Sequence, residues 1–196
     1  MQRRLLKSLQ HSLSGVERTR QRIESLYAVR QLVKRDLEMA YSGLFIRSMS
    51  SFETFVEDLF LAMLAGQTRR STYSVKRLFP ELRSFPTDRI RLLLLGDRKY
   101  FDWLPYYLTE KRAKSFLDGS TPFAALSEAD KKALDKVVYI RNALAHSSSH
   151  ARDTFISVVV GDLTLPPREK PQWDIYALYT VLAPTYPALS TIPPSC

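Results

Sequence analysis

Apolar residues recur at three- and four-residue intervals through most of the chain, which is the periodicity of amphipathic helices. Residues 2–33 combine leucine and valine at this spacing with arginine, glutamine and glutamate, and they predict one long helix. A second long helix is predicted over residues 36–65, where Gly66 provides a stop. The first proline is Pro80, so nothing interrupts these two helices.

Shorter elements are predicted in the middle of the chain. Residues 67–87 read as a connection with a short turn or helix around residues 75–79. A helix follows over residues 87–95, and a further helical segment breaks at Pro105. Ser127 then stands as a capping residue ahead of an acidic first turn, which opens a helix that ends near residue 146.

The C-terminal part of the chain mixes strand and helix patterns. Residues 154–160 read as a strand, paired with residues 163–165 in a small hairpin. Residues 172–183 predict a last helix, and an irregular tail follows. The fold class is therefore expected to be all-α, or helix-dominated, with at most a small β-hairpin near residues 154–165.

Composition bounds the kind of protein. A chain of 196 residues that is 45% hydrophobic can bury one sizeable core, so we expect a single domain over residues 1–196. The only cysteine is Cys196, which excludes a disulfide framework and a cysteine zinc site and favours a reducing, cytoplasmic location. No segment has the roughly 20 apolar residues of a membrane span. Neither a membrane nor a metal or other cofactor is expected.

Positive charge is concentrated at two places. The net charge is +9, and residues 1–35 hold nine Lys or Arg against only Glu17 and Glu24. A second, acid-free cluster surrounds Tyr73 and comprises Arg69, Arg70, Lys76 and Arg77. Such clusters suit a phosphate-rich partner such as RNA. A solvated basic face, or an anionic protein partner, fits the same pattern equally well.

The segment RNALAH, residues 141–146, contains residue types that can cleave RNA. Arg141 and His146 are separated by four residues at the end of a predicted helix. Cleavage of RNA without a metal needs a base for the ribose 2′-hydroxyl, an acid for the leaving 5′-oxygen and a cation for the charged transition state. Histidine can fill either proton role near neutral pH, and a guanidinium holds phosphate oxygens in a fork.

This segment resembles the motif of the HEPN ribonucleases, in which an arginine and a polar residue are followed by a histidine after four to six positions. Asn142 matches the polar position, and residues 143–145 match the small or apolar filler. The stretch SFETFVEDLF, residues 51–60, is similar to the long core helix of that superfamily, with Glu53 as the acidic residue facing the motif and Glu57 or Asp58 behind it. The chain resembles RiboL-PSP-HEPN and toxin-like HEPN proteins over about residues 35–150. The basic N-terminal helix precedes this core, and a C-terminal helix and tail at residues 166–196 follow it.

The resemblance implies an endoribonuclease that leaves 2′,3′-cyclic phosphate and 5′-hydroxyl ends. His146 would transfer the proton, Arg141 would stabilise the phosphate, Asn142 would orient either of them, and Glu53 would support Arg141 or His146. HEPN proteins commonly dimerise with two motifs facing one groove, so a homodimer is implied. They often act as toxins or antiphage-defence effectors, which implies an antitoxin or another defence protein as a partner.

The spacing within the motif sets a geometric condition. Positions 141 and 146 are about 140° apart around an ideal helix and cannot project side by side, whereas Asn142 and His146 share a face. Either the helix unwinds near Ser147, or a complete site combines residues from two chains.

Structural roles for the same residues remain open alternatives. His146 could interact with the last carbonyls of its helix, Arg141 could form a salt bridge with Glu53 or Asp135, and His150 could be a second proton donor. The chain could then be a noncatalytic HEPN module that binds a nucleotide, RNA or a protein. It could also be a helical assembly protein whose N-terminal helix forms an intermolecular bundle.

Overall fold

The computed structural model describes residues 1–68, 73–75, 80–119, 121–146 and 148–162. These residues are helical almost throughout, which confirms the predicted all-α class. The chain forms two compact units, residues 1–134 and 135–196, and the division falls within helix α5, Glu128–Ala145. The organisation as a single domain stays a prediction. None of the described helices has the length and apolarity of a membrane span.

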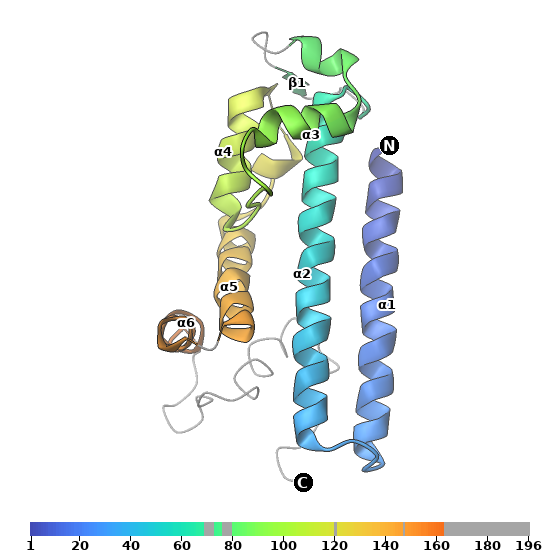
Figure 1. Cartoon of the computed structure of the whole chain (residues 1–196), viewed down its shortest axis with the longest axis vertical. Coiled ribbons are helices and arrows are strands. Elements are labelled where there is room, and N and C mark those ends of the chain that lie inside the picture. The colour runs from blue at the N-terminus through green and yellow to red at the C-terminus, as the bar shows by residue number, and fades with distance from the viewer. Residues whose placement is uncertain (69–72, 76–79, 120, 147, 163–196) are drawn as a thin grey trace. The chain divides into compact units, whose positions relative to one another are not determined.

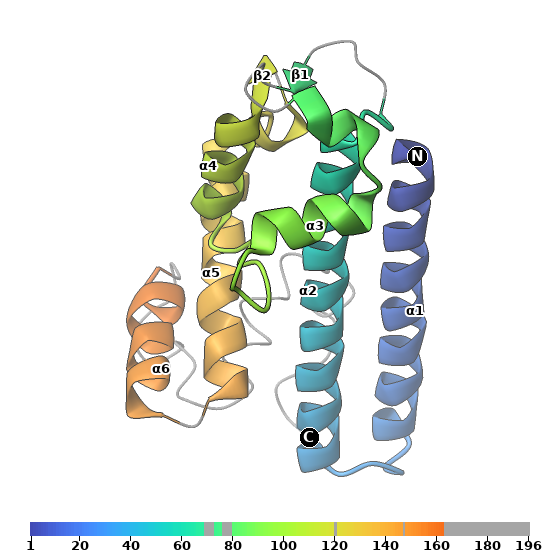
Figure 2. The same cartoon turned by 45° about the horizontal axis from the view of Figure 1, so that its top comes forward.

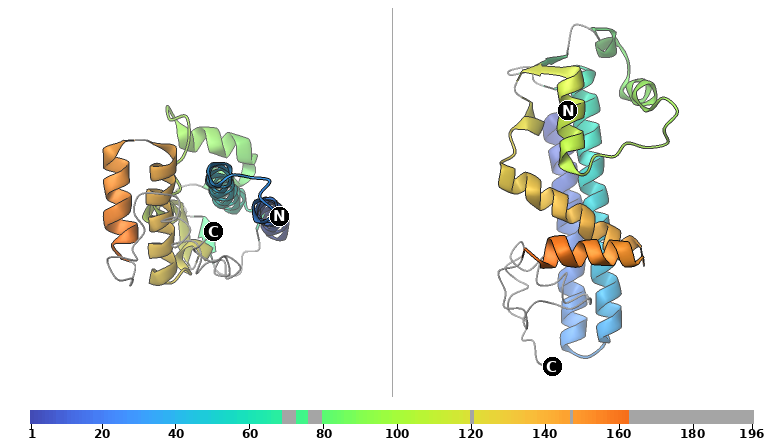
Figure 3. Two further views of the ribbon diagram at one scale, coloured as in Figure 1. Left: turned by 90° about the horizontal axis from the view of Figure 1, so that it is seen from below. Right: turned by 90° about the vertical axis from the view of Figure 1, so that its left-hand side faces the viewer.

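The first unit is built on a long antiparallel helical hairpin. Helix α1, Gln2–Ala28, and helix α2, Lys34–Leu64, run side by side in opposite directions (Figures 1 and 3). Both were predicted, although α1 ends five residues before the predicted end at residue 33. Ser12 and Ser51 share a hydrogen bond of 2.7 Å across the hairpin. A polar contact thus links the two helices of the hairpin.

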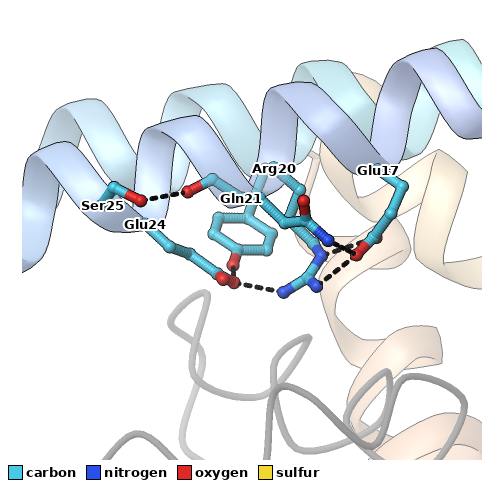
Figure 4. Close-up of polar contacts among 6 residues, drawn as sticks. Glu17, Arg20, Gln21, Glu24 and Ser25 are labelled. Atoms are coloured by element: carbon cyan, nitrogen blue, oxygen red, sulfur yellow. Dashed lines mark hydrogen bonds and ion pairs between the residues drawn. The ribbon is translucent and has the colours of Figure 1, made fainter.

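A buried ionic cluster also joins the two helices (Figure 4). The Arg20 side chain is only 7% exposed, and its guanidinium donates to both Glu17 and Glu24. Glu24 in turn accepts a hydrogen bond from the hydroxyl of Tyr41 on α2. The hydrogen bond from Arg20 lowers the pKa of Glu17, so both partners stay charged. A cation is tolerated at this helix interface because its carboxylate partners are beside it.

The core of the first unit lies at the C-terminal end of α2. Phe60 is fully buried there and meets three aromatic rings edge-on, those of Trp103, Phe116 and Phe123, at centroid distances of 5.4–6.1 Å. Helix α3, Thr87–Leu95, and helix α4, Tyr106–Phe116, cover this end of α2, together with short turns at Pro80–Ser84 and Pro122–Ala124. The predicted helix over residues 87–95 is confirmed, and so is the break at Pro105, after which α4 begins. The helical segment expected before that break is wrong, because residues 97–104 are not helical.

One small ladder of strands accompanies these helices. Strand β1, Tyr73–Val75, pairs antiparallel with β2, Leu117–Gly119 (Figure 2). The sequence had predicted a turn or helix beginning near Val75, which is wrong for that residue because it pairs with Leu117. The rest of that predicted segment, residues 76–79, lies outside the described residues. Strands this short were not recognisable because alternation needs about four residues to show.

Helix α5 begins where the capping pattern predicts. The Ser127 hydroxyl accepts the backbone N–H of Asp130 at 3.1 Å and donates to the Asp130 carboxylate at 2.7 Å. Lys131, one turn later, bridges Glu110 of α4 and Glu128 at 2.8 and 2.7 Å. The start of α5 is thus held by its own cap and by an ion pair to α4.

The predicted strand over residues 154–160 is wrong, because these residues are helical. Helix α6, Ser149–Thr154, continues into a π-helix, η3, Phe155–Val160. A short apolar run cannot distinguish a strand from a buried helix, and here Phe155, Val159 and Val160 lie on one buried helical face. The predicted partner strand at 163–165, the helix over 172–183 and the tail lie outside the described residues.

The second unit is therefore a helical hairpin in its described part. The C-terminal portion of α5 is followed by α6 and η3, which turn back beside it (Figure 2). Lys136 on α5 forms an ion pair of 3.0 Å with Asp162, just beyond η3. This contact fixes the antiparallel direction, and it leaves the RNALAH segment at the turn of the hairpin.

Candidate functional site

The RNALAH segment occupies the end of α5. Arg141 to Ala145 are its last five residues, and His146 is the first residue after it. The backbone N–H of His146 still donates to the carbonyl of Asn142 at 2.9 Å, so helical hydrogen bonding extends to His146. Up to the His146 amide, α5 therefore does not unwind, and Ser147 lies outside the described residues. Regular helical geometry keeps Arg141 and His146 on different sides of the helix end.

The motif residues differ in their exposure. His146 is exposed, Arg141 and Asn142 are half-buried, and the next residue, Ala143, is buried. Ile140, one position before the motif, is 2% exposed and anchors this end of α5. The arrangement combines a solvent-accessible imidazole with two half-buried polar side chains. A proton-transfer group must reach its substrate, and a residue that binds phosphate benefits from being held in place.

The start of α6 lies immediately after the motif. The Ser148 hydroxyl caps this helix by accepting the backbone N–H of Ala151 at 3.2 Å. His150 is exposed in the first turn, four residues beyond His146. The sequence suggested His150 as a second proton donor, and its exposure is compatible with that role. Two exposed histidines thus lie on either side of residue 147.

The acidic residues expected to support the motif are on α2, in the first unit. Glu53 is half-buried near the middle of that helix, and its pairing with Arg141 or His146 stays a prediction. Glu57 has a structural role, because its two carboxylate oxygens accept from Arg91 at 2.5 Å and from Trp103 at 2.9 Å. It therefore holds α3 and the aromatic core to α2, and it is a poor substitute for Glu53.

Asp58, the other substitute considered for Glu53, has an unusual environment. Partial desolvation raises its pKa, and the neighbouring charge of Glu57 adds to this effect. Asp58 lines a cavity of about 510 Å³ with Arg4, Asp88 and Arg91, all from the first unit. Its surroundings are those of a surface cleft between α1, α2 and α3. Within the described residues, no three His, Cys, Asp or Glu side chains gather as metal ligands would.

Of the two predicted basic regions, the structure describes the N-terminal one. The cluster of Arg69, Arg70, Lys76 and Arg77 lies outside the described residues. In the N-terminal region, the sequence counted Arg20 with the other surface cations, whereas the structure buries it between carboxylates. The spacing of Glu17, Arg20 and Glu24, three and four residues apart, was the signal that could have revealed this pairing.

Comparisons with known proteins add no relative. No family model matches the chain, and neither a curated protein nor a solved structure matches it. The assignment to the HEPN superfamily therefore depends on the residues of the motif and of α2 alone, and it is treated below as a proposal.

Proposed function

We propose that this protein is a HEPN-type endoribonuclease that cleaves RNA without a metal ion, through Arg141, Asn142 and His146. The observation that carries the proposal is the position of His146. It is exposed directly after the last residue of α5, and its backbone N–H donates to the backbone carbonyl of Asn142 one turn earlier. Arg141 precedes Asn142 in the chain. An accessible imidazole at the same helix end as a half-buried guanidinium and side-chain amide suits phosphodiester chemistry once two such ends share one groove.

The reaction is a transesterification at phosphorus. The ribose 2′-oxygen attacks the adjacent phosphorus while a base takes the 2′-hydroxyl proton, and the bond from phosphorus to the 5′-oxygen breaks. An acid returns one proton to the departing 5′-oxygen, so a 2′,3′-cyclic phosphate and a 5′-hydroxyl remain. His146 fills one proton role, Arg141 balances the charge that develops on the phosphorane, and Asn142 orients the phosphate or the imidazole.

A second proton-transfer group is needed to complete this reaction. In a homodimer with two motifs at one groove, His146 of a second chain would supply it, and this arrangement would also relieve the angular separation of Arg141 and His146. His150 is the alternative within one chain. Glu53 is proposed as the carboxylate that orients Arg141 or His146, by analogy with the acidic residue of the HEPN core helix.

The biological setting follows from the same analogy. A cytoplasmic ribonuclease of this kind would act as a toxin or as an antiphage-defence effector, and an antitoxin or defence protein would restrain it by covering the groove. A noncatalytic module that binds RNA is the second candidate, favoured by the exposed cations of α1.

Cleavage of labelled RNA in the presence of EDTA tests the proposal. We expect wild-type protein to cleave total RNA or transfer RNA, and His146→Ala and Arg141→Ala to lower the rate by at least about 100-fold. Lys132→Ala, an exposed substitution on the same helix, is the matched control and should keep the wild-type rate. Circular dichroism must show that all three variants are folded.

The ends of the products give a second readout. Fragments should resist dephosphorylation of their 3′ ends until the cyclic phosphate is opened. Cleavage that requires a divalent cation, or that persists in both motif variants, would overturn the proposal. RNA binding by wild-type protein without any cleavage would favour the noncatalytic module instead.

A further inference from the structure

Five cations of α1 share one side of that helix. Taking 100° per residue, Arg3, Lys7, Arg18, Arg4 and Arg22 fall within a sector of about 100°, and neither acidic residue of α1 lies in it. All five side chains are exposed. They extend over about 28 Å of the helix axis. This set is called the α1 basic stripe below.

The stripe has no free acidic partner on its own helix because of Arg20. Glu17 and Glu24 are the only acids of α1, and Arg20 engages both of them at 2.5–2.8 Å on another side of the helix (Figure 4). Among the described residues, no ion pair involves a member of the stripe. The two carboxylates of α1 that could have neutralised these cations are therefore already paired with Arg20.

Most of the stripe also faces away from the rest of the first unit. Arg3 and Arg4, at its start, line cavities with residues of α2, and the cavity of Arg4 includes Asp58 and Asp88. The side of α1 that packs on α2 carries Leu5, Leu9, Val16 and Ile23, roughly opposite to the stripe around the helix. The stripe is thus an outer, strongly charged face, and its remaining positions carry polar side chains such as Ser14 and Gln21.

From this geometry we infer that the α1 basic stripe is a docking surface for the sugar–phosphate backbone of RNA, independent of base sequence. A row of exposed cations about 28 Å long matches a linear polyanion, whose phosphates release counterions when they are neutralised. The serine and glutamine side chains among the cations can donate hydrogen bonds to phosphate oxygens.

An anionic membrane is a poorer match for the same charges. A helix that lies on a membrane inserts its apolar face, and the apolar face of α1 is already packed on α2. The half-exposed Leu6 and Leu13 lie outside the sector of the stripe. The stripe itself contains no apolar anchor.

This inference deepens the proposed ribonuclease function, and it names RNA as the partner for that reason. The stripe would hold a long substrate without contributing to the chemistry at His146. Substrates that are too short to reach the stripe should therefore be cleaved independently of it.

Equilibrium binding to a 20-nucleotide poly(U) tests the stripe, with His146→Ala as background to prevent cleavage. The stripe variant replaces all five cations by Gln, which has a helix propensity similar to Arg and Lys. The matched control replaces five exposed cations elsewhere in the first unit by Gln: Arg98, Lys99, Lys111, Lys114 and Lys132. Both variants lose five positive charges from the chain.

We expect the stripe variant to lose about tenfold or more in affinity, and the slope of log K against log salt to become shallower by up to about 3.5. The control variant should change that slope by less than about 1. Equal losses in the two variants, an unchanged slope in the stripe variant, or binding to phosphatidylserine vesicles with none to RNA would each overturn the inference.

Cleavage of a dinucleotide such as UpA separates this inference from the proposed function. If the stripe variant cleaves UpA normally but long RNA poorly, both stand. If wild-type protein binds RNA through the stripe and cleaves nothing, the docking surface stands and the ribonuclease proposal fails. If the stripe variant binds and cleaves long RNA like wild-type protein, the docking surface is overturned and the ribonuclease remains.

Discussion

Arg20 holds both carboxylate oxygens of Glu17 in a fork, with Nε and Nη2 donating at 2.8 and 2.6 Å. Its remaining terminal nitrogen, Nη1, reaches Glu24 at 2.5 Å, and Glu24 accepts from the hydroxyl of Tyr41 on the other helix. The fork geometry makes this a directional contact as well as an ionic one. The cluster consequently fixes how α1 and α2 are aligned along their length.

Replacing Arg20 by Met should destabilise the protein by about 2 kcal/mol. Removing one partner of a buried ion pair costs about 3–5 kcal/mol, and the figure is reduced here because Glu17 is 36% exposed and partly screened by water. Urea denaturation followed by circular dichroism measures the difference. Arg22→Met, on the exposed side of α1, is the control and should change stability by less than about 0.5 kcal/mol. Equal stability of the two variants would contradict a structural role for Arg20.

The same cluster predicts a dependence of stability on pH. The hydrogen bond from Arg20 lowers the pKa of Glu17 below its ordinary value of 4.5. A carboxylate with a lowered native pKa contributes stability above its unfolded pKa, and this contribution is lost as the pH falls through the native value. The stability gap between wild-type protein and Arg20→Met should therefore narrow as the pH is lowered from 7 to 3. A gap that stays constant over this range would exclude the ionic contribution.

Two glycines should respond to alanine in opposite directions. A Cβ at Gly161 would overlap the backbone carbonyl oxygen of Ser157, so Gly161→Ala should destabilise the end of η3 by about 1–3 kcal/mol. A Cβ at Gly43, within α2, would meet no atom within 4 Å, so Gly43→Ala should stabilise the protein by about 0.5–1 kcal/mol. Thermal unfolding gives the sign of each change, and hydrogen exchange of residues 149–160 localises the effect of Gly161→Ala. Stabilisation by Gly161→Ala would contradict the close contact at Ser157, and destabilisation by Gly43→Ala would contradict the open space at Gly43.

The helices that the sequence predicts well are those specified by local signals. The break at Pro105, the stop at Gly66 and the cap at Ser127 are each decided within one helical turn, and the structure has all three. The segment Phe155 to Val160 was misread because its apolar run fits a strand or a buried helix equally. Its helical state follows from a start upstream, at the cap provided by Ser148.

The candidate site also has one part that local sequence predicts and one part that it does not. The pairing of Arg141 with His146 is a matter of spacing, and the sequence alone is enough to suggest it and to place it at a helix end. The partner of that pair, whether Glu53 or a second chain, depends on how separate elements approach one another, and no periodicity in the sequence specifies this. The burial of Arg20 is intermediate, because its spacing from Glu17 suggests an ion pair but does not indicate the packing that desolvates it.

The cap of α6 provides a test of the turn that follows the motif. Ser148→Ala removes the acceptor for the backbone N–H of Ala151 and should cost about 1 kcal/mol. Ser149→Ala changes an exposed neighbouring serine inside the helix and serves as the control. Hydrogen exchange at the amide of Ala151 should accelerate in the first variant only. Equal exchange rates in both would show that Ser148 does not hold the start of α6.

Mixing two inactive variants tests whether the proposed site combines two chains. If a site needs Arg141 of one chain and only the partner's His146, with His150 as the second proton-transfer group, a heterodimer of Arg141→Ala and His146→Ala chains contains one site with these residues intact. Random assortment of equal amounts would then restore about a quarter of the wild-type sites. If each site uses Arg141 and His146 of the same chain, no heterodimer has an intact site and activity stays absent.

The chains for this mixing experiment should be exchanged by unfolding and refolding them together, and each variant refolded alone sets the background. Recovery of cleavage in the mixture alone would favour a shared site. This is the result we expect, because regular helical geometry keeps Arg141 and His146 apart at the end of α5. Absence of recovery from a mixture verified to contain heterodimers would instead point to a site that needs both His146 side chains of the dimer, or to one that uses Arg141 and His146 of the same chain.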